Sequence, residues 1–171
     1  MPMACCYARL KSNPLRKEDA DCDFTEGPMS EQTNLEIVQR GYKAYADGDL
    51  AALGKLLTDD TEWTYHPTHT GIPWAVHSWK GRDAVFQSFK ILSDLVEFLE
   101  FEADEFITGG DNVVALGHER CRVKATGRIV EAKWVQIFTL RDGKISRYRE
   151  YSDNSAWDRG FSGGSATASR Q

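Results

Sequence analysis

The apolar residues in the first half of the chain recur every three or four positions, as they do on one face of an amphipathic helix. Three stretches have this spacing: residues 31–47, a short stretch after Asp49, and a stretch after Gly81. Asp49 is a good N-cap because its carboxylate can accept a hydrogen bond from a free amide of the first turn. The pattern therefore predicts three helices, with a short strand at residues 62–66 between the second and the third.

From Phe98 onward the pattern favours strands that are separated by turn sequences. Residues 109–112 separate the first strand from the second, residues 126–127 separate the second from the third, and an Asp-Gly pair at 142–143 is a strong hairpin signal. Three helices followed by a four-stranded antiparallel meander, with the early strand able to join its edge, is an α+β plan. The sequence shows no internal repeat and no second domain.

Glu119 breaks the polar pattern of its predicted strand. Alternate residues of 113–123 point to opposite faces of a sheet, and most polar residues of this stretch fall on one face. Glu119 falls on the other face, together with the small residues Ala115 and Gly117. A carboxylate that faces a core is costly unless it is paired, protonated or lining a cavity. We expect Glu119 to face a cavity for which its small neighbours leave room; neutralisation by a core arginine or tyrosine is the alternative.

Composition and charge exclude several classes of protein. The chain has 171 residues and a formal net charge of -5, which argues against nucleic acid as the main partner because phosphate contacts need a basic face. No apolar run approaches the roughly 18–20 residues of a membrane span, so no membrane partner is expected. The four cysteines have no zinc-binding spacing. A reducing, cytoplasmic setting is the simplest interpretation.

The two ends of the chain lack apolar periodicity. Residues 1–30 mix acidic and basic side chains and have neither the apolar run of a signal peptide nor the acid-poor composition of a transit peptide. We expect them to be a disordered extension. Residues 162–171 are rich in glycine, serine and alanine and are expected to form a flexible tail. The folded domain is therefore expected to span residues 31–161.

Both faces of the predicted sheet carry apolar side chains. In the strand at 130–140, Trp134 and Phe138 share one face, whereas Val135 and Ile137 lie on the other. A sheet with one face in water needs fewer apolar residues on that face. We therefore expect a homodimer that forms through the outer face of the sheet.

Five segments of the chain stand in an order that is typical of one superfamily. They are residues 42–53, Trp63 with Pro67 after it, residues 81–85, residues 134–145 and residues 149–153. In this order they resemble the nuclear transport factor 2-like superfamily, in its SnoaL-like and ketosteroid-isomerase-related branch. The resemblance spans roughly residues 31–158. It implies a cone-shaped α+β fold in which a curved antiparallel sheet and three helices enclose one apolar pocket. The superfamily includes isomerases, cyclases, dehydratases, epoxide hydrolases and non-catalytic proteins, so the fold alone does not settle the function.

The resemblance also suggests a base at the end of the first strand. Steroid isomerases of this fold have a general-base aspartate before a proline at this point, and this chain has His66 before Pro67. Histidine can accept a proton near neutral pH; a loop histidine bonded to backbone is the alternative. Gln136 stands near the second acid of those enzymes, but an amide has no acidic proton to give. The steroid isomerase pattern is therefore not preserved.

The limonene epoxide hydrolase branch of the superfamily offers a second comparison. Its enzymes activate water with two aspartates that an arginine bridges. An ungapped comparison places Glu119 and Asp153 at the two acids, whereas Gly117 stands where the arginine would be. Arg149, on the same predicted face as Asp153, is a spatial substitute for that arginine. Asp153 also lies at a strand end, where an aspartate can simply cap the following turn.

These residues together predict a small-molecule enzyme that requires neither a cofactor nor a metal ion. It is expected to act on an apolar, oxygenated compound as an isomerase, cyclase, dehydratase or hydrolase, with Glu119 and Asp153 as acid and base and His66 near the pocket mouth. The residues expected to bind the substrate are Tyr42, Trp63, Tyr65, Trp134, Gln136 and Arg149. The alternative is a non-catalytic domain that binds a small ligand or serves dimerisation. An open cavity that both acids reach would favour the enzyme.

Overall fold

The computed structural model describes residues 30–66, 72–75 and 78–162. Within these residues the chain forms α1 (Glu31–Ala46), α2 (Leu50–Lys55), β1 (Leu57–His66), β2 (Trp79–Lys80), α3 (Arg82–Leu95), β3 (Val96–Gly109), β4 (Asn112–Val123), β5 (Ile129–Arg141), β6 (Lys144–Ser152) and α4 (Asn154–Phe161). The three predicted helices are present. A fourth helix, α4, forms where the sequence suggested only a turn. The predicted N-terminal extension, the predicted tail and Pro67 lie almost wholly outside the described residues.

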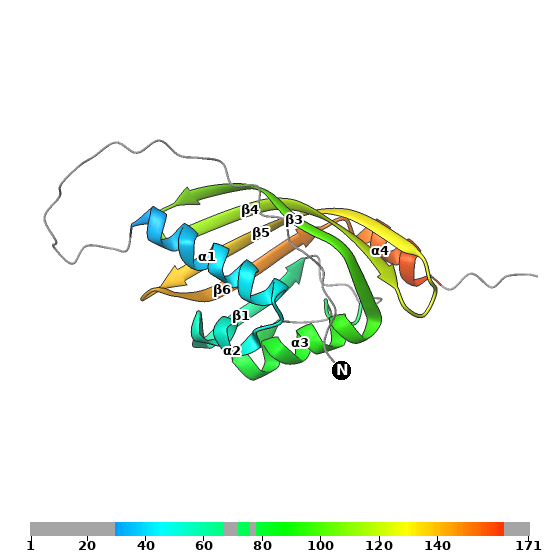
Figure 1. Cartoon of the computed structure of the whole chain (residues 1–171), viewed down its shortest axis with the longest axis horizontal. Coiled ribbons are helices and arrows are strands. Elements are labelled where there is room, and N and C mark those ends of the chain that lie inside the picture. Colours follow the sequence, from blue (N-terminus) through cyan, green and yellow to red (C-terminus); the bar gives the residue numbers. More distant parts are fainter. Residues whose placement is uncertain (1–29, 67–71, 76–77, 163–171) are drawn as a thin grey trace, which may run out of the picture.

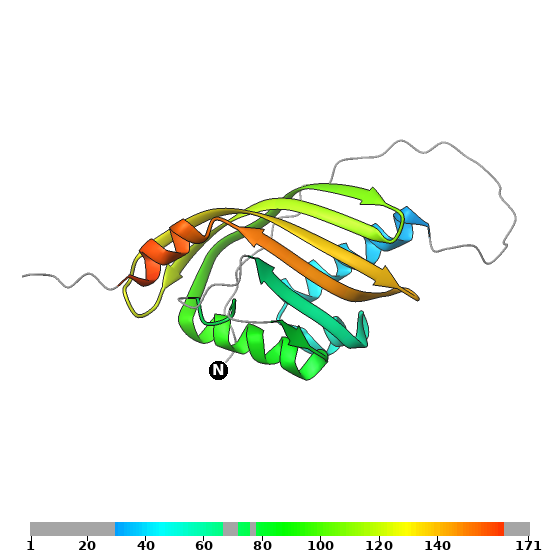
Figure 2. The same cartoon turned by 180° about the vertical axis from the view of Figure 1, so that it is seen from behind.

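The strands form one sheet in the order β2-β1-β6-β5-β4-β3 (Figure 1). The turn sequences correctly predicted the antiparallel meander of β3 to β6. The early strand β1 joins the edge of this meander, but it runs parallel to β6, so the sheet is mixed rather than wholly antiparallel. The sheet curves over α1 and α3 (Figures 1 and 2). The predicted α+β cone is therefore confirmed, with helices covering the concave face.

Side-chain caps fix where the first two helices begin. The Ser30 hydroxyl accepts a hydrogen bond from the Thr33 amide at 3.2 Å at the start of α1. The Asp49 carboxylate accepts one from the Ala52 amide at 2.8 Å at the start of α2, as its position in the sequence predicted. Each bond satisfies an amide that the first helical turn leaves free. The interhelical turn contains Gly48 at φ 70°, in the left-handed region that suits glycine.

The hairpin between β5 and β6 determines which side chains of β6 reach the interior. Asp142 and Gly143 both have positive φ, at 50° and 72°, as in a two-residue type I′ turn. The register then shifts by one residue, because Leu140 pairs with Ile145 whereas Thr139 pairs with Arg147. A one-residue shift of this kind is a β-bulge, and it moves the following side chains to the other face. Beyond the bulge, the even-numbered residues of β6, such as Tyr148 and Glu150, therefore face the core. In a regular hairpin the odd-numbered residues would do so.

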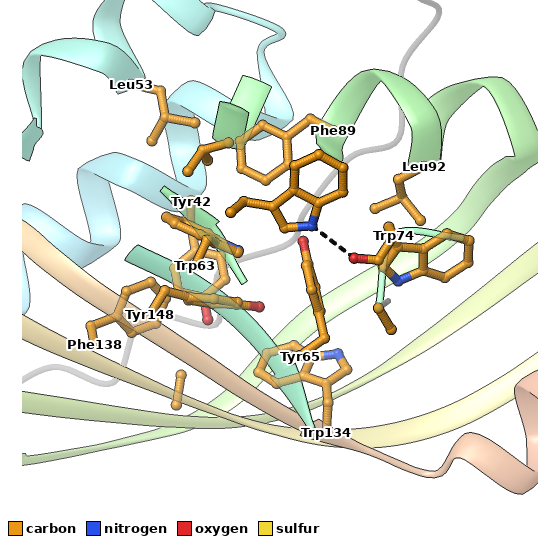
Figure 3. Packing of buried hydrophobic residues seen from close by; sticks show 14 of the residues in the cluster. Tyr42, Leu53, Trp63, Tyr65, Trp74, Phe89, Leu92, Trp134, Phe138 and Tyr148 are labelled. Carbon is orange, nitrogen blue, oxygen red and sulfur yellow. Dashed lines mark hydrogen bonds between the residues drawn. The ribbon is translucent and has the colours of Figure 1, made fainter. Parts of the chain in front are cut away.

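The core between the concave face and the helices contains many aromatic rings (Figure 3). Trp63 of β1 stacks on Tyr148 of β6 with 3.9 Å between ring centroids, and Phe89 of α3 meets Trp63 edge-on at 5.4 Å. Such pairs contribute about 0.5–1.5 kcal/mol each beyond the burial of their area. The packing therefore joins α3, β1 and β6, which come from distant parts of the chain.

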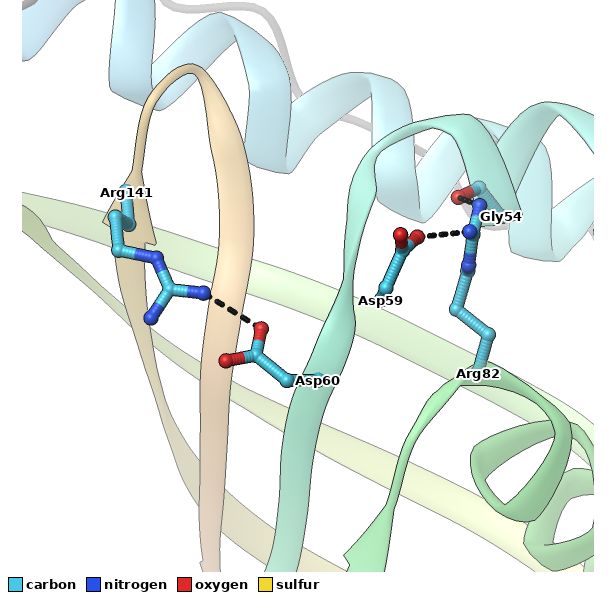
Figure 4. A network of polar contacts seen from close by, with 5 residues as sticks. All are labelled: Gly54, Asp59, Asp60, Arg82 and Arg141. Atoms are coloured by element: carbon cyan, nitrogen blue, oxygen red, sulfur yellow. Dashed lines mark hydrogen bonds and ion pairs between the residues drawn. The ribbon is translucent and has the colours of Figure 1, made fainter.

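The strand β1 begins earlier than the sequence predicted. It starts at Leu57 rather than at residue 62, and the pairing register with β6 shifts between Leu57 and Glu62. Two exposed ion pairs hold this irregular stretch to its neighbours (Figure 4): Arg82 pairs with Asp59, and Arg141 Nη2 lies 2.6 Å from Asp60 Oδ1. Exposed pairs contribute little to stability, because water screens the charges and the long side chains lose freedom when they pair. They position the start of β1 rather than carry the stability of the fold.

No helix among the described residues is long and apolar enough to cross a membrane. The longest helix, α1, is amphipathic and has 16 residues. Its buried side includes Ile37, Val38 and Tyr42, which face the sheet. The apolar stripe that the sequence predicted for this helix is therefore confirmed, because its residues are the ones that α1 packs against the core.

Candidate functional site

A pocket lies between the concave face of the sheet and the helices. Its volume, counted as the space open to the centres of water molecules, is about 70 Å³. This is room for several water molecules or a small organic ligand. Most of the residues that line it are aromatic, and those with carboxyl or amide side chains are Glu119, Gln136 and Glu150. Ligand pockets typically combine an apolar wall with a few polar groups in this way.

Glu119 lines this pocket from β4, on the face that the alternation of its strand predicted. Only 6% of the residue is exposed. Its Oε1 accepts a hydrogen bond from Trp157 Nε1 at 3.2 Å, and Cys121 Sγ lies 4.0 Å from its Oε2. Burial raises the pKa of Glu119 well above its usual value, and the negative charge of Glu150 raises it further. The carboxyl group of Glu119 therefore favours its protonated form.

Glu150 lines the same pocket from β6 and was not predicted from the sequence. It lies directly opposite Gln136 of β5. Its Oε2 accepts hydrogen bonds from Gln136 Nε2, at 2.8 Å, and from the hydroxyl of Tyr148. Burial raises the pKa of Glu150, while the hydrogen bonds from Tyr148 and Gln136 oppose that rise. These two donors make Glu150 the better site for a negative charge.

Two tyrosines complete the polar network around Glu150. The hydroxyl of Tyr42 donates to Gln136 Oε1, which fixes the amide so that its nitrogen points at Glu150. Burial, followed by the charge of Glu150, raises the pKa of both Tyr42 and Tyr148 well above the usual value. Both hydroxyls therefore stay protonated as hydrogen-bond donors near neutral pH. The network runs from Tyr42 through Gln136 to Glu150 and is closed by Tyr148.

The two carboxyl groups differ in how the protein supports a charge. Glu150 receives two strong hydrogen bonds, whereas Glu119 receives one from an indole, apart from the distant thiol. Among the described residues that line the pocket, none is a lysine, arginine or histidine. Two carboxyl groups in one apolar site without a cation cannot both ionise easily. The geometry favours a single charge, on Glu150, and a proton on Glu119.

Asp153 does not reach the pocket, and this corrects the predicted pairing of Glu119 with Asp153. It is exposed and caps α4, where its carboxylate accepts hydrogen bonds from the Ser155 amide at 3.0 Å and the Ser155 hydroxyl at 2.6 Å. The bond from the Ser155 side chain is the main cause that lowers the pKa of Asp153. The capping alternative therefore describes its position. Glu150 is the second carboxyl group of the pocket.

Two other residues that were predicted to belong to the site, His66 and Arg149, lie on the convex face of the sheet. His66, at the end of β1, stacks on Tyr151 with 4.9 Å between ring centroids, and it does not line the pocket. Arg149 lies between the inward-facing Tyr148 and Glu150 and pairs in register with Thr64. Because neighbouring residues of a strand point to opposite faces, Arg149 is directed away from Glu119. It therefore does not bridge the acids of the pocket.

The remaining predictions concern the wall of the pocket. Tyr42, Trp63, Tyr65 and Gln136 line it, and Figure 3 shows the rings of the first three. Trp134 is buried behind this wall, stacked on Phe101 with 5.1 Å between ring centroids.

The small size of Gly117 makes room for a neighbouring ring rather than for the cavity. A β-carbon at this position would collide with the ring of Trp134 and with the backbone carbonyl of Glu102. The expectation that Gly117 leaves space for the pocket is therefore corrected.

A separate group on the convex face has the spacing of metal ligands. One ligand atom each from Glu100, Glu102 and His118 lies within 4.8 Å of the others. His118 Nδ1 is 2.8 Å from Asp104 Oδ2, and this bond is the main cause that raises the pKa of His118. His118 is adjacent to the inward-facing Glu119, so it points to the other side of the sheet. This group has no part in the pocket.

Comparison with known proteins places this architecture in a family. The sequence model of the SnoaL-like domain matches residues 38–148. A structure of an NTF2-like protein from Burkholderia xenovorans LB400 is 33% identical, covers 78% of this chain and 98% of its own, and superposes with a TM-score of 0.71. No curated protein matches the chain significantly.

More distant structures share the fold alone. A Bacillus subtilis protein that is named only provisionally as an isomerase is 20% identical, with 79% of this chain and 97% of that chain covered and a TM-score of 0.67. TerC, crystallised with polyporic acid, is 21% identical, with 75% and 98% covered and a TM-score of 0.68. The fold of the described residues thus recurs among proteins with different names.

Proposed function

Because the chain belongs to the SnoaL-like family of the NTF2-like superfamily, we propose that it is an enzyme that acts on a small molecule in the pocket by general acid–base catalysis. The observation that carries this proposal is the pair of carboxyl groups, Glu119 and Glu150, that line one apolar pocket. Pairs of titratable groups whose surroundings separate their pKa values are typical of acid–base sites. The reaction is of the isomerase, cyclase, dehydratase or hydrolase type, and it uses only side chains of the protein.

The difference between the two carboxyl groups assigns their roles. Glu119 holds a proton and acts as the general acid towards an oxygen atom of the substrate. Glu150 holds the charge and acts as the general base towards a carbon-bound proton or a water molecule. Each positioned group of this kind supplies typically about 10²–10⁴-fold in rate. The pair is reset when Glu150 releases the proton that it gained and Glu119 is reprotonated.

One observation supports the alternative of a domain that binds a ligand without catalysis. Glu150 is held by Tyr148 and by Gln136, which in turn is held by Tyr42. A network that the protein satisfies by itself can serve to fix the core rather than to react. Under this alternative the pocket binds a small apolar molecule that leaves unchanged.

A substrate screen with matched variants tests the proposal. The panel consists of small epoxides, unsaturated ketones and tertiary alcohols, assayed with the wild type, Glu119→Gln, Glu150→Gln and Glu131→Gln. Glu131 is a suitable control because it lies on β5 with its side chain 72% exposed and pairs with the exposed Arg120. We expect each pocket variant to lose roughly 100-fold or more in kcat, while the control keeps its activity. Full turnover in both pocket variants would refute the proposal. Binding of a panel compound without any turnover would favour the alternative.

We also propose a homodimer that forms through the convex face of the sheet. This face carries the exposed apolar side chains of Ile107 and Tyr151, which are 50% and 45% exposed. Ile107 lies in register with Val114 of β4, which is partly exposed on the same face. Light scattering on the wild type and on Ile107→Lys tests this. We expect a dimer that the substitution weakens, and a monomeric wild type would contradict the proposal.

A further inference from the structure

The charged side chains that line the pocket among the described residues are all acidic. Two carboxyl groups line it, and none of its described lining residues is a lysine, arginine or histidine. Three of the strong hydrogen-bond donors in the pocket are already engaged by its own acceptors: the hydroxyls of Tyr42 and Tyr148 and the indole of Trp157. A negative charge on a ligand therefore finds no cation among these lining residues, and these three donors are not free to bind it. It also meets the charge of Glu150 in a site of low polarity, where like charges repel strongly.

The wall of the pocket is suited to the opposite charge. Its aromatic side chains include Tyr65, Trp63, Tyr148, Trp74 and Trp157. The face of an aromatic ring carries negative electrostatic potential and attracts a cation that lies over it, most strongly for tryptophan. The Trp157 ring meets that of Trp74 edge-on, with 5.0 Å between ring centroids.

Each of the two carboxyl groups is bonded to an aromatic side chain of the pocket wall. Trp157 donates its indole N–H to Glu119 at 3.2 Å, and the ring of Tyr148, whose hydroxyl is bonded to Glu150, stacks on Trp63. Each carboxyl group is thus held by one of the aromatic side chains of the wall. A positive charge in the pocket can lie near ring faces and near a carboxylate at the same time.

We propose that the pocket binds small organic cations in preference to neutral or anionic molecules of the same shape, and that its substrates carry or develop positive charge at the reacting carbon. This inference rests on the proposed function and deepens it, because it concerns the same two carboxyl groups. It assigns the substrate class: compounds that ionise to a carbocation, such as tertiary or benzylic alcohols and epoxides, or compounds that carry an ammonium group.

The corresponding reaction balances with the groups of the pocket alone. Glu119 gives its proton to the hydroxyl oxygen of a tertiary alcohol, and the C–O bond breaks with its electron pair going to oxygen, so that water leaves. The positive charge on carbon faces the rings and the Glu150 carboxylate. Glu150 then takes a proton from the neighbouring carbon, whose C–H electron pair forms the alkene. The product is an alkene and water, and one proton has moved from Glu119 to Glu150.

Three probes of matched size test the inference in binding alone: phenyltrimethylammonium, its uncharged isostere tert-butylbenzene, and benzoate. Calorimetry and the fluorescence of the pocket tryptophans measure their affinities for the full-length wild type. We expect the cation to bind roughly tenfold more tightly than the isostere, which is within the range of a desolvated cation–π contact, and benzoate not to bind. Equal affinity for the first two probes, tighter binding of the isostere or of benzoate, or failure of the cation to bind would each overturn the inference.

Variants separate this inference from the proposed catalysis. Glu150→Gln removes the charge, so we expect it to reduce the preference for the cation several-fold, whereas Glu131→Gln leaves that preference unchanged. The wild-type comparison does not depend on how well either variant folds. If the cation preference holds but neither pocket variant loses turnover, the catalytic proposal and the substrate class fail, and the preference for cations in binding stands. If turnover is lost in both variants but no preference for the cation is found, this inference fails alone.

Discussion

Replacing Glu119 by glutamine should change the way in which the stability of the protein depends on pH. Glutamine keeps the shape of the side chain and can still accept the hydrogen bond from Trp157, but it carries no charge at any pH. Burial raises the pKa of Glu119 in the folded protein well above the value of 4.5 that an unperturbed glutamate has. The folded state therefore keeps this proton at pH values where the unfolded chain has released it.

The sign of the effect follows from this difference in proton binding. The stability that the raised pKa contributes is fully present below the unfolded pKa of 4.5 and is lost as the pH rises through the folded pKa. In that window the free energy of unfolding of the wild type falls, relative to that of Glu119→Gln, by at most about 1.4 kcal/mol per pH unit for one proton. For a domain of this size, 1 kcal/mol corresponds to roughly 4 °C in Tm. The Tm difference should therefore change by up to roughly 6 °C per pH unit.

Calorimetry or thermal fluorescence from about pH 5 to pH 8 measures this difference. Contributions from groups that do not interact with Glu119 are common to both proteins and cancel in the comparison, whereas Glu150, whose charge acts on Glu119, titrates together with it in the wild type. Glu131→Gln serves as the control, because it makes the same change of side chain at an exposed position outside the pocket. A wild type that gains stability relative to Glu119→Gln as the pH rises would refute the reasoning, because it would show that Glu119 is ionised in the folded protein.

Three further substitutions have definite expected outcomes. Gly117→Ala places a methyl group against the Trp134 ring and a backbone carbonyl, so we expect a loss of about 3 kcal/mol or more in urea denaturation; a loss below about 1 kcal/mol would contradict this packing. Asp153→Ala removes the N-cap of α4 and should cost about 1 kcal/mol in the same assay, with unchanged affinity of the pocket for its probes; lost affinity would place Asp153 in the site. Tyr148→Phe removes a bond that lowers the pKa of Glu150, so that pKa should rise in a carboxyl NMR titration, and a fall would contradict the network.

The place of Glu119 was predictable because its strand is regular. Between Asn112 and Arg122, β4 pairs with β5 without a register shift, so that alternation holds from one end to the other. A carboxyl group on the apolar face was therefore a reliable sign of the pocket. The side chain that donates a hydrogen bond to Glu119, the indole of Trp157, lies in α4, and a short helix of this kind leaves little periodicity to detect.

Glu150 was missed because of the bulge in β6. In a regular hairpin closed by the turn at 142–143, Arg149 would lie opposite the inward-facing Gln136. The extra residue at Ser146 moves Glu150 into that position instead. The sequence contains no signal for the bulge, since a one-residue shift depends on how the strand curves against the core. The predicted faces of Arg149 and Asp153 were wrong for the same reason, whereas the turn itself was predicted correctly.

The helices and turns of the fold were predictable because their signals are local. Asp49 caps α2, and the Asp-Gly pair closes the last hairpin, each through a bond or a backbone conformation set by neighbouring residues. The parallel pairing of β1 with β6 joins residues that are far apart in the chain. Nothing in a local pattern specifies the direction of such a pairing, so the mixed sheet was not predicted.

The most direct test of the account is the protonation state of the two pocket glutamates. Protein labelled with ¹³C at the glutamate carboxyl carbon can be titrated by NMR from about pH 4 to pH 9, with Glu119→Gln and Glu150→Gln used to assign the two signals. We expect both to titrate above the usual range of glutamate, and Glu119 to release its proton at the higher pH. A Glu119 signal that titrates near 4.5, the value of an unperturbed glutamate, would contradict the assignment of Glu119 as the acid.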